Sequence, residues 1–161
     1  MIDTEHVVAD LYGMINVPTA VWIDESGIIV RPPDVMFADD TFRDFHGISS
    51  EPYLAALRAW VRNGTLPMTK EDARRYQTAP DANQQLARAE FALAWHLHKQ
   101  GHGEAAEKHF LRAGELAPND WTIRRGSMPI RGLDPMGAPF VELFQEWTAA
   151  GSPYYNVPRL K

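Results

Sequence analysis

The stretch NVPTAVWIDESG, residues 16–27, decides the fold of the first part of the chain. It leads into an apolar run that predicts a strand over residues 19–24, followed by a polar four-residue turn and a second short strand at residues 28–30. Two short strands joined in this way predict an antiparallel β-hairpin, which Pro32-Pro33 is expected to end. Because the first strand has no polar face, we expect it to be buried on both sides.

Helical spacing and helix-terminating residues account for most of the remaining sequence. Helices are predicted at residues 3–12 behind an Asp3 or Thr4 cap, 50–63, 70–78 behind Thr69, from Asp81 to Gly101, 103–117 and 139–150, with a helical turn near 40–45 and an extended tail at 152–161. The chain changes character near residue 65, because only helices are predicted after that point. We therefore expect an α+β fold with two domains, residues 1–64 and 65–161.

Composition excludes several classes of function. The 161 residues carry a formal net charge of −5, which disfavours nucleic acid or an anionic membrane as a partner. No apolar run approaches the ~20 residues that span a bilayer, and the start of the chain lacks a signal-peptide pattern, so a cytoplasmic location is expected. The chain has no cysteine, which removes disulfides, thiolate nucleophiles and cysteine zinc sites. No cofactor is predicted.

The longer string YGMINVPTAVWIDESGIIV, residues 12–30, resembles the C-terminal part of a thioredoxin fold of the TlpA/ResA-like redoxin type. The matching positions are Tyr12, Gly13, Val17, Pro18, Thr19, Ile23, Asp24, Gly27 and Val30. The resemblance covers residues 1–64 and implies a partial thioredoxin-like unit, whose last helix is the one predicted at 50–63. It also implies a cis peptide before Pro18, whereas the alternative is that Pro18 simply precedes a strand and has an ordinary trans peptide.

In that family, the backbone beside the proline binds an extended substrate as an added strand. The resemblance therefore implies that Val17, Pro18 and Thr19 form a peptide-binding site. The half of the fold that normally carries a Cys-x-x-Cys pair is absent from this sequence. Because the attacking species in thiol exchange is a thiolate, the chain as given is expected to be non-catalytic. Whether a longer product with cysteines exists is left open.

The predicted hairpin is too small to be stable alone in water. Its faces need cover and its edges need partners, which either the helical half or a second copy of the chain can supply. In the second arrangement two hairpins pair edge to edge about a two-fold axis. We expect this arrangement, and hence a homodimer.

Residues 87–120, ARAEFALAWHLHKQGHGEAAEKHFLRAGELAPND, resemble one tetratricopeptide repeat, a helical hairpin of ~34 residues. The matching positions are Leu93, Ala94, Gly101, Ala106, Phe110, Ala113 and Pro118. A lone repeat cannot bury its faces, so the helices at 70–78 and 139–150 are expected to pack on either side of it. Arrays of this family bind peptides or partner proteins in a concave groove. A binding groove and a purely structural bundle both remain open for a single repeat.

Charged residues of the helical half suggest two further sites. Arg124, Arg125 and Arg131 are candidates for binding an anion, and the alternative is internal ion pairing with Asp120 or Asp134. The histidines at positions 96, 98, 102 and 109 are interpreted as solvated side chains, so no metal site is predicted.

Two functions of different classes follow. The first is a redoxin-family protein without its cysteine pair, whose tetratricopeptide-like region binds other proteins. The second is a scaffold or adaptor that binds a peptide through the helical groove. An enzyme that uses histidine and arginine without cysteine is a third possibility.

Overall fold

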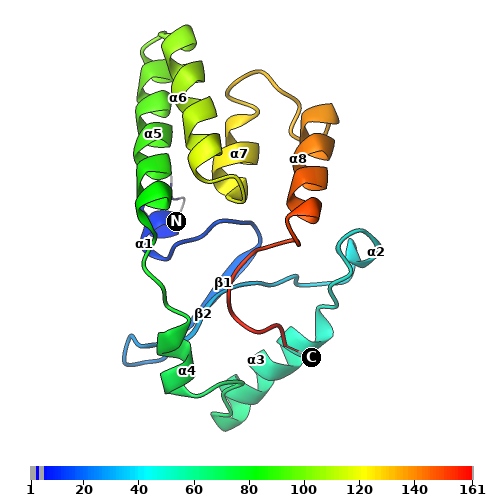
Figure 1. Ribbon diagram of the computed structural model, residues 1–161. Helices are drawn as coiled ribbons and strands as arrows, with labels where there is room; N and C mark the ends of the chain where they lie inside the picture. The colour runs from blue at the N-terminus through cyan, green and yellow to red at the C-terminus, as the bar shows by residue number, and fades with distance from the viewer. Residues whose placement is uncertain (1–2, 4–5, 161) are drawn as a thin grey trace. The chain divides into compact units, whose positions relative to one another are not determined.

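A computed structural model describes residue 3 and residues 6–160 of the chain (Figure 1). Within that part, the fold is α+β, with one two-stranded antiparallel sheet. The elements are α1 (Val7–Leu11), β1 (Thr19–Ile23), β2 (Ile29–Val35), α2 (Arg43–His46), α3 (Glu51–Asn63), α4 (Lys70–Arg75), α5 (Ala82–Lys99), α6 (Gly103–Leu116), α7 (Trp121–Ser127) and α8 (Ala138–Ala149). None of these helices is long and apolar enough to cross a membrane.

The chain divides into two compact units, and each is made of segments that are distant in the sequence. The helical unit joins the residues up to Val17 with Ala79–Tyr154. The hairpin unit joins Pro18–Thr78 with the tail that begins at Tyr155. This division differs from the single predicted boundary near residue 65. The hairpin unit extends past that point because α4 packs against β2.

The turn of the β-hairpin has the predicted position. Gly27 has a φ of +77°, a conformation that glycine adopts readily, and its N–H donates to the Asp24 carbonyl at 2.9 Å. The Asp24 carboxylate also accepts hydrogen bonds from the N–H groups of Ser26 and Ile28, both at 3.0 Å. These bonds within the turn explain why the polar sequence after β1 reverses the chain.

The second strand is longer than predicted. It continues through Pro32 and Pro33 to Val35, so the prediction that the prolines end it is wrong. The register has a β-bulge between Ala20 and Trp22 of β1, opposite the prolines. A bulge leaves one residue of the ladder unpaired, so a missing proline N–H is tolerated there.

One face of the hairpin is covered by α3 of the same chain. Trp22 is only 3% exposed, stacks on Trp60 at 5.1 Å between ring centroids, and meets Tyr53 edge to face. Its indole N–H donates to the Tyr53 hydroxyl at 2.6 Å. Ile23 remains exposed, so the expectation that β1 is buried on both sides is wrong. Edge-to-edge pairing of two copies stays a prediction.

The buried face of α3 agrees only in part with the spacing of Leu54, Leu57 and Val61, which predicts a shared inner face. Leu57 packs in the hairpin cluster together with Tyr53 and Trp60, whereas Val61 is 73% exposed. Large aromatic side chains bury more area than valine does, which accounts for their place on this face.

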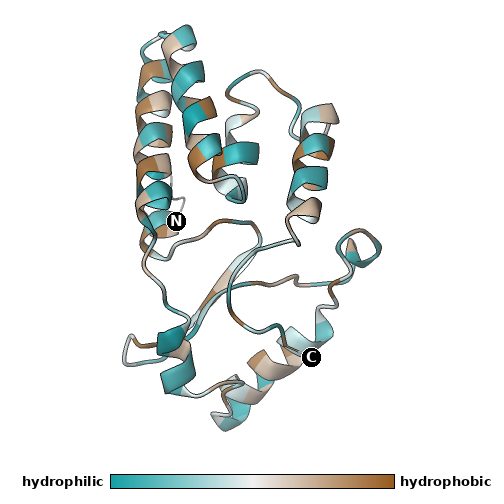
Figure 2. Cartoon of the chain, in the orientation of Figure 1, coloured by the Kyte–Doolittle hydropathy of each residue, from teal (hydrophilic) through white to brown (hydrophobic). Residues whose placement is uncertain are grey.

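Helices α5 and α6 form the predicted antiparallel pair (Figure 1). Asp81 caps α5 in a capping box with Gln84, and Gly101 adopts a φ of +81° in the connecting turn. The predicted small and aromatic positions of α6 are buried, namely Ala106, Phe110 and Ala113. Hydrophobic and hydrophilic residues alternate along α5, as expected for a helix with one buried face (Figure 2).

Three predictions about the helices need correction. Helix α7 was not predicted; Asp120 caps it by accepting hydrogen bonds from the N–H groups of Thr122 and Ile123. Helix α4 belongs to the hairpin unit, where it packs on β2, whereas α8 packs on α7. On α8, Leu143 is buried and Val141 is exposed, although helical spacing from Phe144 and Trp147 predicts an inner position for Val141.

The first helix is shorter than predicted. The Asp3 carboxylate accepts hydrogen bonds from the N–H groups of Val8 and Ala9, at 2.9 and 3.1 Å, and so caps α1. Thr4, the other candidate cap, lies outside the described residues. The apolar side chains of Val7 and Leu11 are exposed.

Candidate functional site

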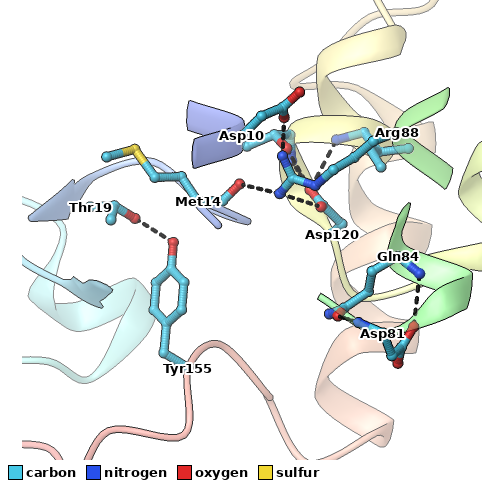
Figure 3. A network of polar contacts seen from close by, with 10 residues as sticks. Asp10, Met14, Thr19, Asp81, Gln84, Arg88, Asp120 and Tyr155 are labelled. Carbon is cyan, nitrogen blue, oxygen red and sulfur yellow. Dashed lines mark hydrogen bonds and ion pairs between the residues drawn. The ribbon is translucent and has the colours of Figure 1, made fainter. Parts of the chain in front are cut away.

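Arg88 of α5 binds the N-terminal segment of the helical unit, residues 10–15 (Figure 3). Its guanidinium group forms an ion pair with Asp10 of α1 and donates to the Met14 carbonyl at 3.3 Å. It also lies 3.9 Å from the Asp120 carboxylate, at the start of α7. One cation therefore joins α1, the residues after it and the cap of α7.

A second main-chain contact holds the same segment. The N–H of Trp121, the first residue of α7, donates to the Ile15 carbonyl at 2.8 Å. Asn16, the next residue, is buried. The start of α7 and Arg88 thus bind two successive carbonyl groups of an irregular backbone segment.

Asp120 is the buried acid of this network. Burial raises the pKa of its carboxyl group, and the Thr122 hydroxyl and the Arg88 charge oppose that shift. The Thr122 hydroxyl donates to the carboxylate at 2.5 Å. The same carboxylate caps α7. We therefore interpret Asp120 as a structural residue and not as a catalytic acid.

A cleft of about 230 Å³ opens beside Arg88, between α1, α5 and α7. Its lining includes the aromatic side chains of Phe91 and Trp95 and the exposed Lys99. The Lys99 ammonium lies 5.4 Å from the Trp95 ring centroid, a cation–π distance. The cleft therefore offers an apolar wall with a positive charge at its rim, which suits an apolar side chain followed by an acidic group.

The three predicted peptide-binding residues lie where the two units divide. Val17 is the last residue of the N-terminal part of the helical unit, and Pro18 the first of the hairpin unit. The Val17 side chain is 79% exposed. Thr19 begins β1, and its hydroxyl lies 2.7 Å from the Tyr155 hydroxyl of the tail (Figure 3).

The predicted anion-binding arginines have partners within the chain. Arg124 pairs with Glu146 at 2.6 Å, and Arg131 forms a bidentate pair with Glu107 at 2.7 and 2.8 Å. The pair with Arg131 lowers the pKa of the Glu107 carboxyl group. Internal ion pairing was the alternative considered for these arginines, although the acids are not the expected Asp120 and Asp134.

Arg125 is held differently. It donates through Nε to the Pro135 carbonyl at 3.0 Å and lies 4.7 Å over the Phe140 ring. Arg124 and Arg131 line one cleft of about 430 Å³ between α6, α7 and α8, whereas Arg125 is not in its lining. The structure therefore does not bring the three guanidinium groups to one point.

Sequence reasoning missed Arg31, the most deeply buried charged residue of the hairpin unit. Its exposed fraction is 0%, and it forms an ion pair with Asp34 of the same strand. Its Nη2 also donates to the Pro158 carbonyl at 3.0 Å. A single arginine next to two prolines carries no sequence signal of burial, because its acceptors lie in a strand bulge and in a distant tail.

No group of three or more potential metal-ligating side chains gathers anywhere in the described part of the chain. His109 instead pairs with Glu90 across α5 and α6 at 2.5 Å. The Trp95 and His98 rings stack at 5.8 Å.

Comparison with protein-family models, curated proteins and solved structures finds no significant match. The thioredoxin-like and tetratricopeptide-like resemblances remain predictions from the sequence. The geometry of the two units is therefore the basis for any proposal of function.

Proposed function

We propose that the protein is a non-catalytic adaptor that binds a peptide segment on its helical unit, in the cleft between α1, α5 and α7. One observation carries this proposal. The cleft has an open aromatic wall, formed by Phe91 and Trp95, with the Lys99 ammonium beside Trp95 at 5.4 Å from its ring centroid. Arg88 and the Trp121 N–H are occupied by the carbonyls of Met14 and Ile15, so a partner peptide would bind beside that segment, on the aromatic wall.

The lining of the cleft narrows the chemistry of the ligand. Phe91 and Trp95 supply apolar contact area, and aromatic pockets of this kind anchor the side chains that dominate binding energy. Lys99 lies at the same cleft and favours an acidic neighbour, whereas the acid that lines the cleft, Asp10, is already paired with Arg88. The proposed ligand is a peptide with one large apolar side chain and an acidic residue close to it.

The test uses a random peptide library displayed on phage and selected on the full chain. Ala92 is exposed and lines the cleft, so Ala92→Glu blocks the site and reverses its charge preference without removing a core side chain. Ala89→Glu is the matched control, because Ala89 is exposed on the same helix and does not line the cleft. Selected peptides should bind the wild type, Ala89→Glu and Pro18→Ala, and lose binding to Ala92→Glu. Equal binding to the Ala89 and Ala92 variants would reject the proposal.

A redoxin-like origin for the hairpin unit is the second candidate. It is supported by Thr19, which the resemblance assigns to substrate binding and whose hydroxyl meets the tail at the Tyr155 hydroxyl. Without a cysteine no thiolate is available, so this origin does not bring catalysis of thiol exchange. Incubation with a dithiol and a model disulfide should give only the background rate. Turnover above that rate would contradict the non-catalytic assignment.

A further inference from the structure

In the hairpin unit, the tail packs on a surface formed by Thr19, Trp22, Val30 and the buried Arg31, which we call the cradle. The Arg31 guanidinium group pairs with Asp34, donates to the Pro158 carbonyl and lies 5.8 Å from the Tyr53 ring centroid. Its Nε is buried and has no hydrogen-bond partner within the described residues. Because Asp34 neutralises its charge, this arginine is suited to a neutral carbonyl acceptor and not to a phosphate or a carboxylate.

Side chains of the tail occupy defined places on the same surface. Val157 is 6% exposed, and Leu160 packs against the cluster that contains Trp22 and Val30. The Tyr155 hydroxyl meets Thr19 at 2.7 Å. The tail therefore presents one polar side chain, two apolar side chains and one main-chain carbonyl to the cradle.

The tail forms no regular secondary structure over residues 153–160 apart from a bend. Over these residues the tail belongs to no β-ladder, and its contacts with the hairpin include one side-chain pair and one bond to a main-chain carbonyl. These contacts join residues 136 and 127 positions apart in the sequence. The tail therefore binds to the cradle through the kinds of contact that a separate peptide would make.

We propose that this cradle is a second peptide-binding site, which accepts an extended partner segment of the form Val-Pro-x-Leu and which the chain's own tail occupies in the free protein. The proposal concerns the hairpin unit and does not depend on the cleft of the helical unit. A partner segment would place its apolar residues where Val157 and Leu160 lie and offer its proline carbonyl to Arg31.

Arg31 makes exchange of the tail for another peptide more favourable than release of the tail into water. If the tail leaves, the Arg31 guanidinium group loses the Pro158 carbonyl as an acceptor, which is unfavourable to the extent that the ion pair with Asp34 keeps the group out of water. A second peptide restores that hydrogen bond. The free chain should therefore bind a competing peptide weakly, because only the fraction with a released tail is competent to bind.

The probe is a fluorescent synthetic peptide with the sequence of residues 152–161, SPYYNVPRLK, titrated against the full-length chain and followed by anisotropy. Val157→Asp weakens the tail in cis, because it places a charge in an apolar site. Val61→Asp is the matched control: it makes the same substitution in the same unit, at a valine of α3 that is 73% exposed. A peptide with aspartate in place of its valine is the control ligand.

We expect Val157→Asp to bind the probe about tenfold or more tightly than the wild type and Val61→Asp do, with no binding of the control ligand. Equal affinity of all three proteins would overturn the proposal. So would an absence of binding to Val157→Asp while its thermal unfolding stays cooperative.

Two further measurements keep the test decisive. If Val157→Asp does not fold, Tyr155→Phe removes only the hydroxyl group that meets Thr19 and should raise probe affinity severalfold, and an unchanged affinity would then contradict the proposal. Sedimentation of the wild type provides the other measurement. A concentration-dependent dimer that Val157→Asp abolishes would assign the cradle to the tail of a second copy, and the partner peptide would be excluded.

Discussion

The hairpin unit and the helical unit bury their interiors by different means. The helical unit closes around small and aromatic residues, such as Ala94, Ala106 and Phe110, that are close in the sequence. The hairpin unit buries an ion pair, Arg31 with Asp34, and is completed by a tail from far along the chain. Because the hairpin unit also has an aromatic core around Trp22, we expect loss of packing volume to be the largest effect in the helical unit and loss of a buried charge partner to be a large effect in the hairpin unit.

The largest expected effect is in the helical core. Phe110 is 3% exposed and meets Phe91 edge to face at 5.4 Å. Phe110→Ala should lower the free energy of unfolding by about 4 kcal/mol, because it leaves a cavity where two helices meet. Urea unfolding followed by far-ultraviolet circular dichroism measures the change. The neighbouring Leu111 is half exposed, and Leu111→Ala should have a much smaller effect; similar losses for the two variants would show that α6 is not packed as described.

The next effect concerns the buried ion pair of the hairpin unit. Arg31→Met should lower the free energy of unfolding by about 3 kcal/mol, because it leaves the Asp34 carboxylate buried without its cation. The double variant Arg31→Met with Asp34→Leu removes both charges and should recover most of that loss. If the single and double variants were equally unstable, side-chain volume and not charge would limit this unit as well, and the contrast between the units would disappear.

Local signals in the sequence predicted much of the helical unit. Asp81 and Gly101 mark the start of one helix and the turn after it, and the spacing of Ala106 and Phe110 identifies a buried face. Such features depend on residues within a few turns of one another, so one sequence is enough to identify them. Helix α7 was missed because it is short and its cap, Asp120, follows a proline that was interpreted only as a stop signal.

Long-range contacts set the features that the sequence did not reveal. The burial of Arg31 depends on a carbonyl of the tail, and the inner face of α3 includes Trp60, which stacks on Trp22 of β1. The prediction for Thr19 stays a prediction, and the residues around it gave no indication that its hydroxyl would meet Tyr155 of the tail. Spacing along one element carries no information about such pairs.

A smaller and matched effect is expected at two helix caps, one in each unit. The Asp81 carboxylate accepts the Gln84 N–H at 2.8 Å in the helical unit, and the Thr69 hydroxyl accepts the Asp72 N–H at 3.0 Å in the hairpin unit. Asp81→Ala and Thr69→Ala should each lower the free energy of unfolding by about 1 kcal/mol. Asp81→Asn and Thr69→Ser keep the cap and should restore stability. A loss confined to one unit would show that the other helix is not limited by its cap.

The smallest effect is a dependence on pH in the hairpin unit. Burial lowers the pKa of the His46 imidazole, with partial opposition from the Asp40 charge. The neutral ring accepts the Ile48 N–H at Nδ1, at 3.0 Å, and stacks on Phe37. The folded state therefore favours the neutral form, so its contribution to stability is complete above pH 6.5 and is lost as the pH falls below that value toward the folded-state pKa.

Urea midpoints at neutral and mildly acidic pH measure this dependence. His46→Gln should flatten the decline, whereas His102→Gln, at an exposed position in the turn between α5 and α6, should leave it unchanged. A decline that persists in full in the His46 variant would assign it to other groups.

The order in which the ribosome makes the chain gives the discontinuous hairpin unit a particular consequence. Pro18–Thr78 is translated before Ala79–Tyr154. The acceptor for Arg31 is the carbonyl of Pro158, which is translated only after that long helical segment. During that interval the nascent hairpin has a guanidinium group that lacks its final acceptor and an apolar surface that lacks its last cover. This uncovered apolar surface is one that a chaperone can bind, and we expect such binding to end once the tail is translated and covers it.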